Sequence, residues 1–128
     1  MRSLEKETVM ALHRLLTDTV GGAHGLRDGG LLDSAVLAAY ATFDGVELYP
    51  TVEEKAARLA CSLISNHAFL DGNKRIGILA MLTLLAANGR TLSPTDEELT
   101  ALGLGVAAGR LGYGDILGFI RMHAAKDE

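Results

Sequence analysis

The most restrictive feature of the sequence is an apolar stretch at residues 76–87, IGILAMLTLLAA, in which Thr83 is the only polar side chain. As a helix this stretch extends for about 18 Å, well short of the ~30 Å hydrocarbon core of a bilayer. A helix on a protein surface shows polar residues along one face, and this stretch has no such face. We therefore predict a helix that is buried on every side at the centre of a helical bundle.

The rest of the chain is suited to surround such a helix. The chain has 128 residues, of which 48% are hydrophobic, so it can form one compact domain (residues 1–128) with a sizeable core. Apolar residues at helical spacing predict a first helix over about residues 4–18, which ends at Gly21 and Gly22. The glycine-rich stretch from Gly21 to Gly30 then predicts a loop.

Further helices are indicated by apolar stripes and by capping residues. One stripe consists of Ala35, Val36, Ala39 and Tyr40, and a later one of Ile116, Phe119, Ile120 and His123. The segment 51–54, TVEE, is a capping box that opens a helix running towards His67. Asn88 and Gly89 end the apolar helix, and Ser93-Pro94 predicts the start of the next one, with proline at its first position.

Strand-like sequence is confined to the segment 43–50, FDGVELYP. Its Asp-Gly pair predicts a tight turn, so we expect a short extended flap there. The predicted fold class is all-α: a compact bundle of about six helices with one central apolar helix.

The charge and the termini exclude several classes of protein. The formal net charge is −4 and the pI is about 5.5, which argues against a broad basic face that binds nucleic acid directly. The single cysteine, Cys61, excludes an intrachain disulfide, and its apolar neighbours predict a buried thiol in a reducing compartment. The charged segment 1–7 lacks the apolar core of a signal peptide. We expect a cytoplasmic protein without a membrane partner.

The segment 67–75, HAFLDGNKR, connects the helix that precedes it with the apolar helix. Gly72 permits a backbone conformation that a side chain would hinder, so the amides of Gly72, Asn73 and Lys74 can point outward at a helix N-terminus. Such amides, together with the helix dipole, form an anion site. Lys74 and Arg75 add positive charge, and an arginine can donate two parallel hydrogen bonds to a phosphate.

Two more residues of this segment suit phosphate chemistry. Asp71 offers a hard oxygen ligand, and one carboxylate with phosphate oxygens and water is the usual way in which Mg²⁺ is bound. His67 lies at the rim of the predicted anion site and can accept a proton from an attacking hydroxyl. The segment therefore fits phosphoryl or nucleotidyl transfer, in which a protein mainly positions groups and neutralises charge.

The same nine residues resemble the motif of the Fic/Doc family, histidine-x-Phe-x-Asp/Glu-Gly/Ala-Asn-Gly/Lys-Arg. The lysine at position 74 resembles the Doc branch, the "death on curing" toxins of toxin–antitoxin modules. The segments 11–16, 21–36 and 47–57 also look like Doc-type sequence. The resemblance implies a small Fic/Doc-type helical bundle with the motif between two central helices.

The resemblance also implies roles for single residues. His67 matches the catalytic base and Asp71 the Mg²⁺ ligand. The anion-binding loop is matched by Gly72, Asn73 and Lys74, and the phosphate-binding arginine by Arg75.

In the Doc branch the enzyme is an ATP-dependent protein kinase that modifies a threonine of elongation factor Tu and so arrests translation. Fic proteins with glycine at the position of Lys74 usually transfer AMP from ATP instead. Gly72 stands where the best-known Doc toxin has alanine, so the motif has features of both branches. We favour the kinase; nucleotidyl transfer and a non-catalytic binding module are the alternatives.

Partners follow from the same resemblance. The inhibitory segment of many Fic enzymes, Ser/Thr-x-x-x-Glu-Gly/Asn, does not occur in this sequence. A Doc-type toxin is instead inhibited by a separate antitoxin of the Phd kind, whose disordered tail folds into a helix on binding. The flap corresponds to the segment that docks the target protein in Fic enzymes, which makes Leu48 and Tyr49 candidate docking residues.

Each residue also has a simpler interpretation. An isolated histidine at position 67 would more often be a core residue, Lys74-Arg75 a solvated helix start, and Asp71 an ordinary N-cap. His13 is interpreted as a packing or surface residue, and Arg27-Asp28 as a loop ion pair. For His67, Asp71, Lys74 and Arg75, the spacing of the whole motif favours the functional interpretation.

Overall fold

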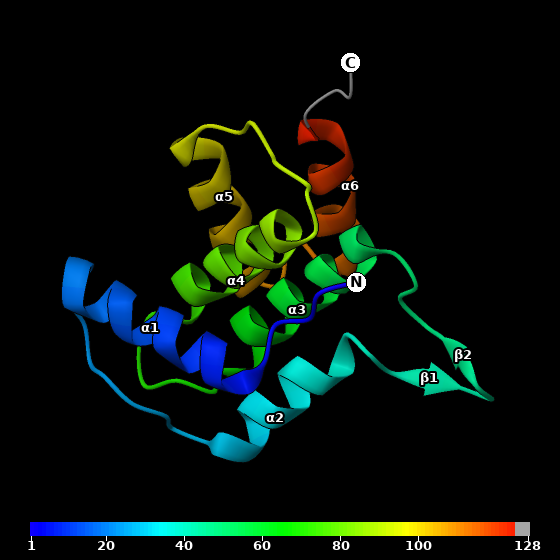
Figure 1. Cartoon of the computed structure of the whole chain (residues 1–128). Helices are drawn as coiled ribbons and strands as arrows, with labels where there is room; N and C mark the ends of the chain where they lie inside the picture. The colour runs from blue at the N-terminus through cyan, green and yellow to red at the C-terminus, as the bar shows by residue number, and fades with distance from the viewer. Residues whose placement is uncertain (125–128) are drawn as a thin grey trace.

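A computed structural model describes residues 1–124 and shows six α-helices and one short hairpin in that range (Figure 1). The elements are α1 (Lys6–Val20), α2 (Gly29–Ala38), β1 (Thr42–Phe43), β2 (Val46–Glu47), α3 (Val52–Asn66), α4 (Asn73–Ala87), α5 (Asp96–Ala107) and α6 (Tyr113–His123). The all-α fold class and the number of helices are confirmed. The flap is confirmed as a two-stranded antiparallel hairpin.

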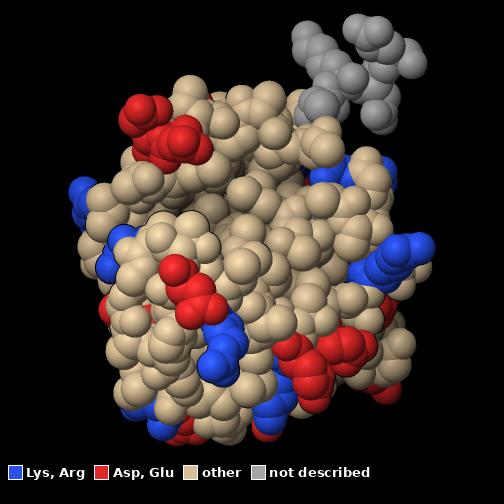
Figure 2. Space-filling model, turned by 60° about the vertical axis from the view of Figure 1, so that its left-hand side comes forward, with Lys and Arg blue, Asp and Glu red and all other residues tan. Residues whose placement is uncertain are grey.

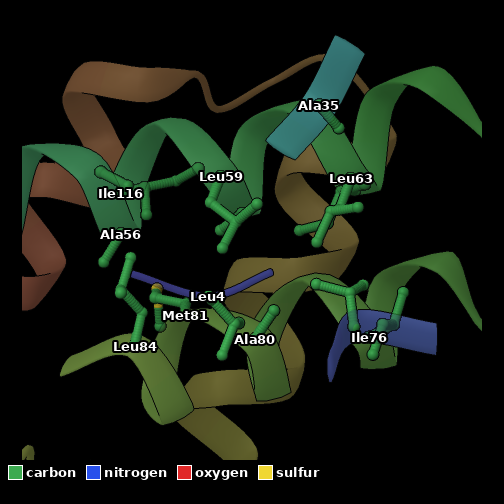
Figure 3. Close-up of a cluster of buried hydrophobic side chains, with 14 of the residues drawn as sticks. Leu4, Ala35, Ala56, Leu59, Leu63, Ile76, Ala80, Met81, Leu84 and Ile116 are labelled. Atoms are coloured by element: carbon green, nitrogen blue, oxygen red, sulfur yellow. The ribbon is translucent and has the colours of Figure 1, made fainter. Parts of the chain in front are cut away.

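The two helices on either side of the motif, α3 and α4, form the centre of the bundle. Helix α3 packs along α4 and also contacts α2, α5 and α6, while α1 and α5 pack on α4. Figure 3 shows the apolar side chains of α3 directed at those of α4, with Leu63 and Ile76 among them. Gly77 permits this close packing, because a Cβ atom at position 77 would lie 2.5 Å from Ile64 Cγ1.

Helix α4 is less enclosed than predicted. Its buried residues are Ile76, Gly77, Ala80, Met81, Leu84 and Leu85. By contrast Ile78, Leu79 and Leu82 are only half-buried and line a cavity against α5. The prediction that this helix is buried on every side is therefore wrong along one strip. Apolar side chains that line a cavity and those that fill a core have the same composition, so the sequence does not distinguish them.

Capping residues set the starts of three helices. At Thr51 the predicted capping box is present, since the Thr51 side chain accepts the Glu54 amide and Glu54 accepts the Thr51 amide. The predicted start at Ser93-Pro94 is wrong, because α5 begins two residues later with a second capping box, Thr95 and Glu98. Two reciprocal hydrogen bonds define a helix start more strongly than a proline, which has a suitable fixed φ but adds no hydrogen bond.

The start of α2 also differs from the prediction. Gly29 and Gly30 belong to this helix rather than to the loop before it, because the Asp28 side chain caps the helix by accepting the Leu31 amide at 3.1 Å. Asp28 and Arg27 form no ion pair within residues 1–124, so that interpretation is wrong.

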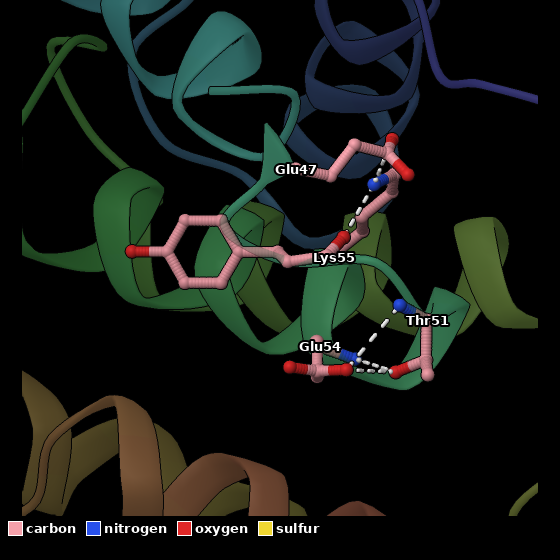
Figure 4. A network of polar contacts seen from close by, with 5 residues as sticks. Glu47, Thr51, Glu54 and Lys55 are labelled. Carbon is pink, nitrogen blue, oxygen red and sulfur yellow. Dashed lines mark hydrogen bonds and ion pairs between the residues drawn. The ribbon is translucent and has the colours of Figure 1, made fainter. Parts of the chain in front are cut away.

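A buried lysine fixes the hairpin to the bundle (Figure 4). Lys55 of α3 is only 2% exposed, and its ammonium group donates to Glu47 Oε1 at 2.9 Å and to the Tyr49 carbonyl. At the far end of the hairpin, Asp44 and Gly45 both have positive φ, as a tight two-residue turn requires. The hairpin is thus held at its base while its tip is exposed.

The surface carries charges of both signs. On the face in Figure 2, a broad area carries no charged side chains. Around and below it, Lys and Arg lie among Asp and Glu, and no basic patch is seen on this face. No helix in the described part of the chain is long and apolar enough to cross a membrane. Cys61 is a free, partly buried thiol.

A histidine–carboxylate pair joins the end of α6 to the start of α5. His123 Nδ1 donates to the Phe119 carbonyl at 2.9 Å, and Nε2 donates to Glu98 Oε2 at 2.7 Å. Both ring nitrogens face oxygen acceptors, which favours the imidazolium. The bond to Phe119 and then that to Glu98 raise the pKa of His123 above its ordinary 6.5, while hydrogen bonds from Thr95 and His123 lower the pKa of Glu98.

This pair predicts a pH-dependent contribution to stability. A raised folded-state pKa means that the His123 contribution is complete below pH 6.5 and is lost as the pH rises through the folded value. We expect the wild type to have a higher Tm than His123→Phe, which keeps the stacking on Phe119, and the difference to shrink as the pH rises above 6.5 and passes the raised pKa of His123. Thermal unfolding at several pH values measures it. A difference that does not change with pH would contradict the prediction.

Candidate active site

The motif forms the turn between α3 and α4, and residues with positive φ stand at both of its ends. His67 caps the C-terminus of α3 in the left-handed region (φ 54°, ψ 49°), and Gly72 precedes α4 with φ 77°. Glycine adopts this conformation freely, whereas a histidine there costs about 1 kcal/mol or more. The His67 side chain is exposed and makes no hydrogen bond within residues 1–124. It is therefore free to meet a ligand.

The middle of the turn is fixed from inside. Ala68 and Phe69 are buried, with exposed fractions of 0% and 2%. The Asn73 side chain accepts the Phe69 amide at 3.1 Å and donates to the Phe69 carbonyl at 3.0 Å. The side chain of Asn73 thus closes the turn, and only its backbone amide faces outward as an anion donor.

The N-terminus of α4 has no side-chain cap. The amides of Asn73, Lys74 and Arg75 have no acceptor in the described part of the chain. The Gly72 amide, which was expected among the anion donors, instead donates to Asp71 Oδ1 at 2.8 Å. Unpaired amides and the helix dipole attract anions, so the amides of residues 73–75 are the candidate anion donors.

A cavity of about 430 Å³ lies beside this helix start, between α4 and α5. Lys74 and Arg75 line it together with mostly apolar residues, which are Ile78, Leu79, Leu82, Leu99, Thr100, Gly103 and Leu104. Both cationic side chains are exposed. The cavity thus combines a positively charged end, next to the free amides, with an apolar wall.

Asp71 is the candidate metal ligand. It is exposed, and its Oδ2 atom lies so close to Gly22 that a Cβ atom at position 22 would be 2.7 Å away. Within residues 1–124 no three His, Cys, Asp or Glu side chains gather into a metal site. One exposed carboxylate beside a helix start with free amides fits a Mg²⁺ ion whose other oxygen ligands come from a bound nucleotide and water.

Two residues far away in the sequence hold the turn in place. His13 of α1 is 2% exposed, and its Nε2 donates to the Asp71 carbonyl at 2.7 Å. Arg27 donates through Nε to the His67 carbonyl at 2.6 Å and through Nη2 to the Asn66 carbonyl at 3.1 Å. Neither residue was assigned to the site from the sequence. No local pattern indicates them, because their partners are 58 and 40 residues away.

The two candidate docking residues of the flap differ from each other. Leu48 is 51% exposed, and two other hydrophobic residues of the flap, Phe43 (76%) and Val46 (67%), are exposed to a larger degree. Tyr49 is half-buried at the base of the hairpin, and its ring packs edge-on against Tyr113 of α6 at 5.2 Å. Leu48 therefore lies on the free apolar surface of the flap, whereas the ring of Tyr49 helps to fix it.

A six-helix bundle whose central turn carries this histidine, carboxylate, free amides and cations has the fold and motif of the Fic/Doc proteins. The chain belongs to that family: the family model described as "Fic/DOC family" matches residues 3–85, which include the whole motif. It is similar to "Toxin Doc" of Mycolicibacterium smegmatis, with 43% identity over 90 residues that cover 70% of this chain and 67% of the relative. It is also similar to "Protein kinase doc" of Escherichia phage P1, with 27% identity over 121 residues that cover 94% of each chain. These matches confirm the resemblance to Doc-type toxins.

Proposed function

We propose that this protein is a Doc-type toxin that transfers the γ-phosphate of Mg²⁺-ATP to a hydroxyl side chain of a target protein. One observation carries the proposal: the turn that bears the exposed His67 leads directly into a helix start with three free amides and two cations at the edge of a cavity. The names of the two relatives, a toxin and a protein kinase, support the same activity.

The donor nucleotide fits the charge and shape of this site. Its phosphates would bind at the amides of residues 73–75, where Lys74 and Arg75 balance their charge. The cavity volume of about 430 Å³ is within the range of small-molecule pockets, and its apolar wall suits the nucleoside part. Asp71 would hold Mg²⁺ against the phosphate oxygens, and the metal would neutralise negative charge as it develops.

His67 would act as the general base. Its neutral imidazole accepts the proton of the target hydroxyl, while the hydroxyl oxygen forms a bond to the γ-phosphorus. The bond from that phosphorus to the bridging β–γ oxygen breaks, and ADP leaves. The free amides, Lys74 and Arg75 stabilise the charge on the transferred group and on the leaving phosphates.

The target and the inhibitor are proposed from the Doc branch. The target would be a translation factor of the elongation factor Tu type, and its modification would arrest growth in the cytoplasm. The exposed hydrophobic side chains of the flap, Leu48 among them, offer a surface for docking the target. An antitoxin of the Phd kind, with a tail that folds into a helix on the toxin, would keep the enzyme inactive.

A labelling experiment tests the proposed reaction. Purified protein is incubated with cell extract and Mg²⁺-ATP that is labelled on either the γ- or the α-phosphate. Label on a target protein from the γ-phosphate alone supports the kinase. Label from the α-phosphate would mean nucleotidyl transfer, and label from neither would favour a non-catalytic binding module.

Arg75 gives a direct test of the phosphate site. Arg75 is exposed and makes no hydrogen bond or ion pair within residues 1–124, so Arg75→Ala should leave the fold intact. We expect the affinity for Mg²⁺-ATP to fall about 10- to 150-fold, since a hydrogen bond to a charged group contributes about 1.5–3 kcal/mol. Titration calorimetry measures the affinity, with Arg90→Ala, which only breaks a surface ion pair with Glu53, as the control. Unchanged ATP affinity in Arg75→Ala would place the phosphates elsewhere.

A further inference from the structure

His13 is the one buried side chain of α1 that contacts the motif turn through a hydrogen bond. Its Nε2 atom donates to the Asp71 carbonyl at 2.7 Å. Its ring stacks on Phe69, with ring centroids 3.9 Å apart and an interplanar angle of 13°. The same ring lies next to Gly72: a Cβ atom at position 72 would be 3.6 Å from His13 Nε2. One side chain thus contacts three of the six residues of the turn.

The two ends of the turn are held very differently. At the His67 end, Arg27 donates to the carbonyls of Asn66 and His67, and the backbone amides of Arg27 and Asp28 both donate to the Ala68 carbonyl. At the other end, the Asp71 carbonyl accepts from His13 and from no other group in the described part of the chain. The neighbours of Asp71 are held by backbone bonds, from the Leu70 amide to the Gly25 carbonyl and from the Ile76 amide to the Gly72 carbonyl, so His13 is the group that fixes the Asp71 carbonyl itself.

Asp71 and Gly72 are followed at once by the free amides of α4. A shift of the Asp71 backbone would move the carboxylate and change the geometry of the Asp71 Oδ1 bond to the Gly72 amide, which precedes the helix start. A carboxylate that binds a metal together with phosphate oxygens must be placed within about 0.5 Å of the productive geometry. A rigid stacked ring with a directed N–H donor supplies that restraint.

We propose that His13 is a positioning residue, which holds Asp71 and the start of α4 in the geometry that binds Mg²⁺ and the nucleotide phosphates. The inference rests on the proposed function, since it assigns to His13 a part in that same site. It predicts a selective effect: loss of the hydrogen bond weakens the Mg²⁺ and phosphate end of the site and leaves the histidine base in place.

Two substitutions separate the hydrogen bond from the packing. His13→Phe keeps a flat ring stacked on Phe69 but has no donor, whereas His13→Gln keeps an N–H donor at a similar reach and loses the stacked ring. For His13→Phe we expect a near-native Tm, a three- to tenfold higher Mg²⁺ concentration for half-maximal transfer, and a similar rise in the KM for ATP. For His13→Gln we expect values close to those of the wild type.

Hydrogen exchange of the Gly72 amide gives a readout that does not depend on transfer. This amide donates to Asp71 Oδ1, and we expect that bond to be weaker, and exchange therefore faster, in His13→Phe than in His13→Gln. Wild-type Mg²⁺ and ATP dependence together with wild-type exchange in His13→Phe would overturn the proposal. Equal losses in both variants, with equally lowered Tm, would also overturn it, because they would make His13 a packing residue. If the wild type transfers no label but Gly72 exchanges faster in His13→Phe than in His13→Gln, the proposed function is refuted. The role of His13 in positioning the Asp71 backbone would still be supported.

Discussion

Replacing His67 with alanine is expected to lower the rate of transfer by about 10²- to 10⁴-fold, the range that a general base contributes. The fold should remain intact, because the His67 side chain is exposed and makes no hydrogen bond in the described part of the chain. The γ-phosphate labelling assay measures the rate, and thermal unfolding checks the fold. Full activity in this variant would remove His67 from the mechanism.

His24 offers a matched control for this substitution. It is also an exposed histidine, and its only hydrogen bond and ion pair within residues 1–124 are with Thr17 and Asp18, near the end of α1. His24→Ala should retain transfer and toxicity. Expression in growing cells then separates two classes of protein: a catalytic toxin loses its toxicity with His67→Ala, whereas a binding module that sequesters a partner keeps it.

The second large effect is expected at Gly77, where α3 and α4 pack close together. A Cβ atom at position 77 would lie 2.5 Å from Ile64 Cγ1 and 3.2 Å from the Ala60 carbonyl. Gly77→Val places three carbon atoms there, and such overpacking costs about 2–3 kcal/mol of the free energy of unfolding, more than the few tenths gained in helix propensity. Denaturant unfolding measures the loss. The control is Gly118→Val on α6, where an added Cβ meets nothing within 4 Å and stability should barely change.

A double-mutant cycle tests whether Ile64 causes this effect. Ile64→Ala alone should cost about 2–5 kcal/mol through the cavity it leaves. In the presence of Gly77→Val the new side chain fills part of that cavity, so the double variant should be more stable than the sum of the two single effects by about 1 kcal/mol or more. Strict additivity would show that the overpacking is relieved elsewhere.

The sequence predicted best those features that depend on neighbours in the chain. The capping box at Thr51 and the Asp44-Gly45 turn use hydrogen bonds or backbone angles within four residues, and both are confirmed. The start of α5 follows the same rule as the start of α3, since Thr95 and Glu98 repeat the capping-box pattern. The predicted start rested on Ser93-Pro94 and did not include this box, although the box is a local pattern of the sequence.

The motif part of the candidate site could be predicted because its residues are neighbours in the chain; the residues that contact it from elsewhere in the sequence could not. Residues 67–75 are consecutive, so their spacing alone brings a histidine, a carboxylate, backbone amides and cations into one turn and the helix start that follows it. His13 and Arg27 could not be assigned, because their roles arise from contacts that only the folded chain makes. The partly open strip of α4 could not be predicted for a related reason: whether α5 covers these side chains depends on how whole helices pack.

The bracing of the motif by distant segments has a consequence for folding kinetics. The contacts of His13 and Arg27 with the turn close chain loops of 58 and 40 residues, and long-range contacts of this kind form late because their closure entropy must be overcome first. A nascent or partly folded chain can therefore contain the complete motif before its turn is braced. If the toxin acts as proposed, the cell that synthesises it has an interval between translation of the motif and maturation of the enzyme, in which an inhibitor can bind before any target is modified.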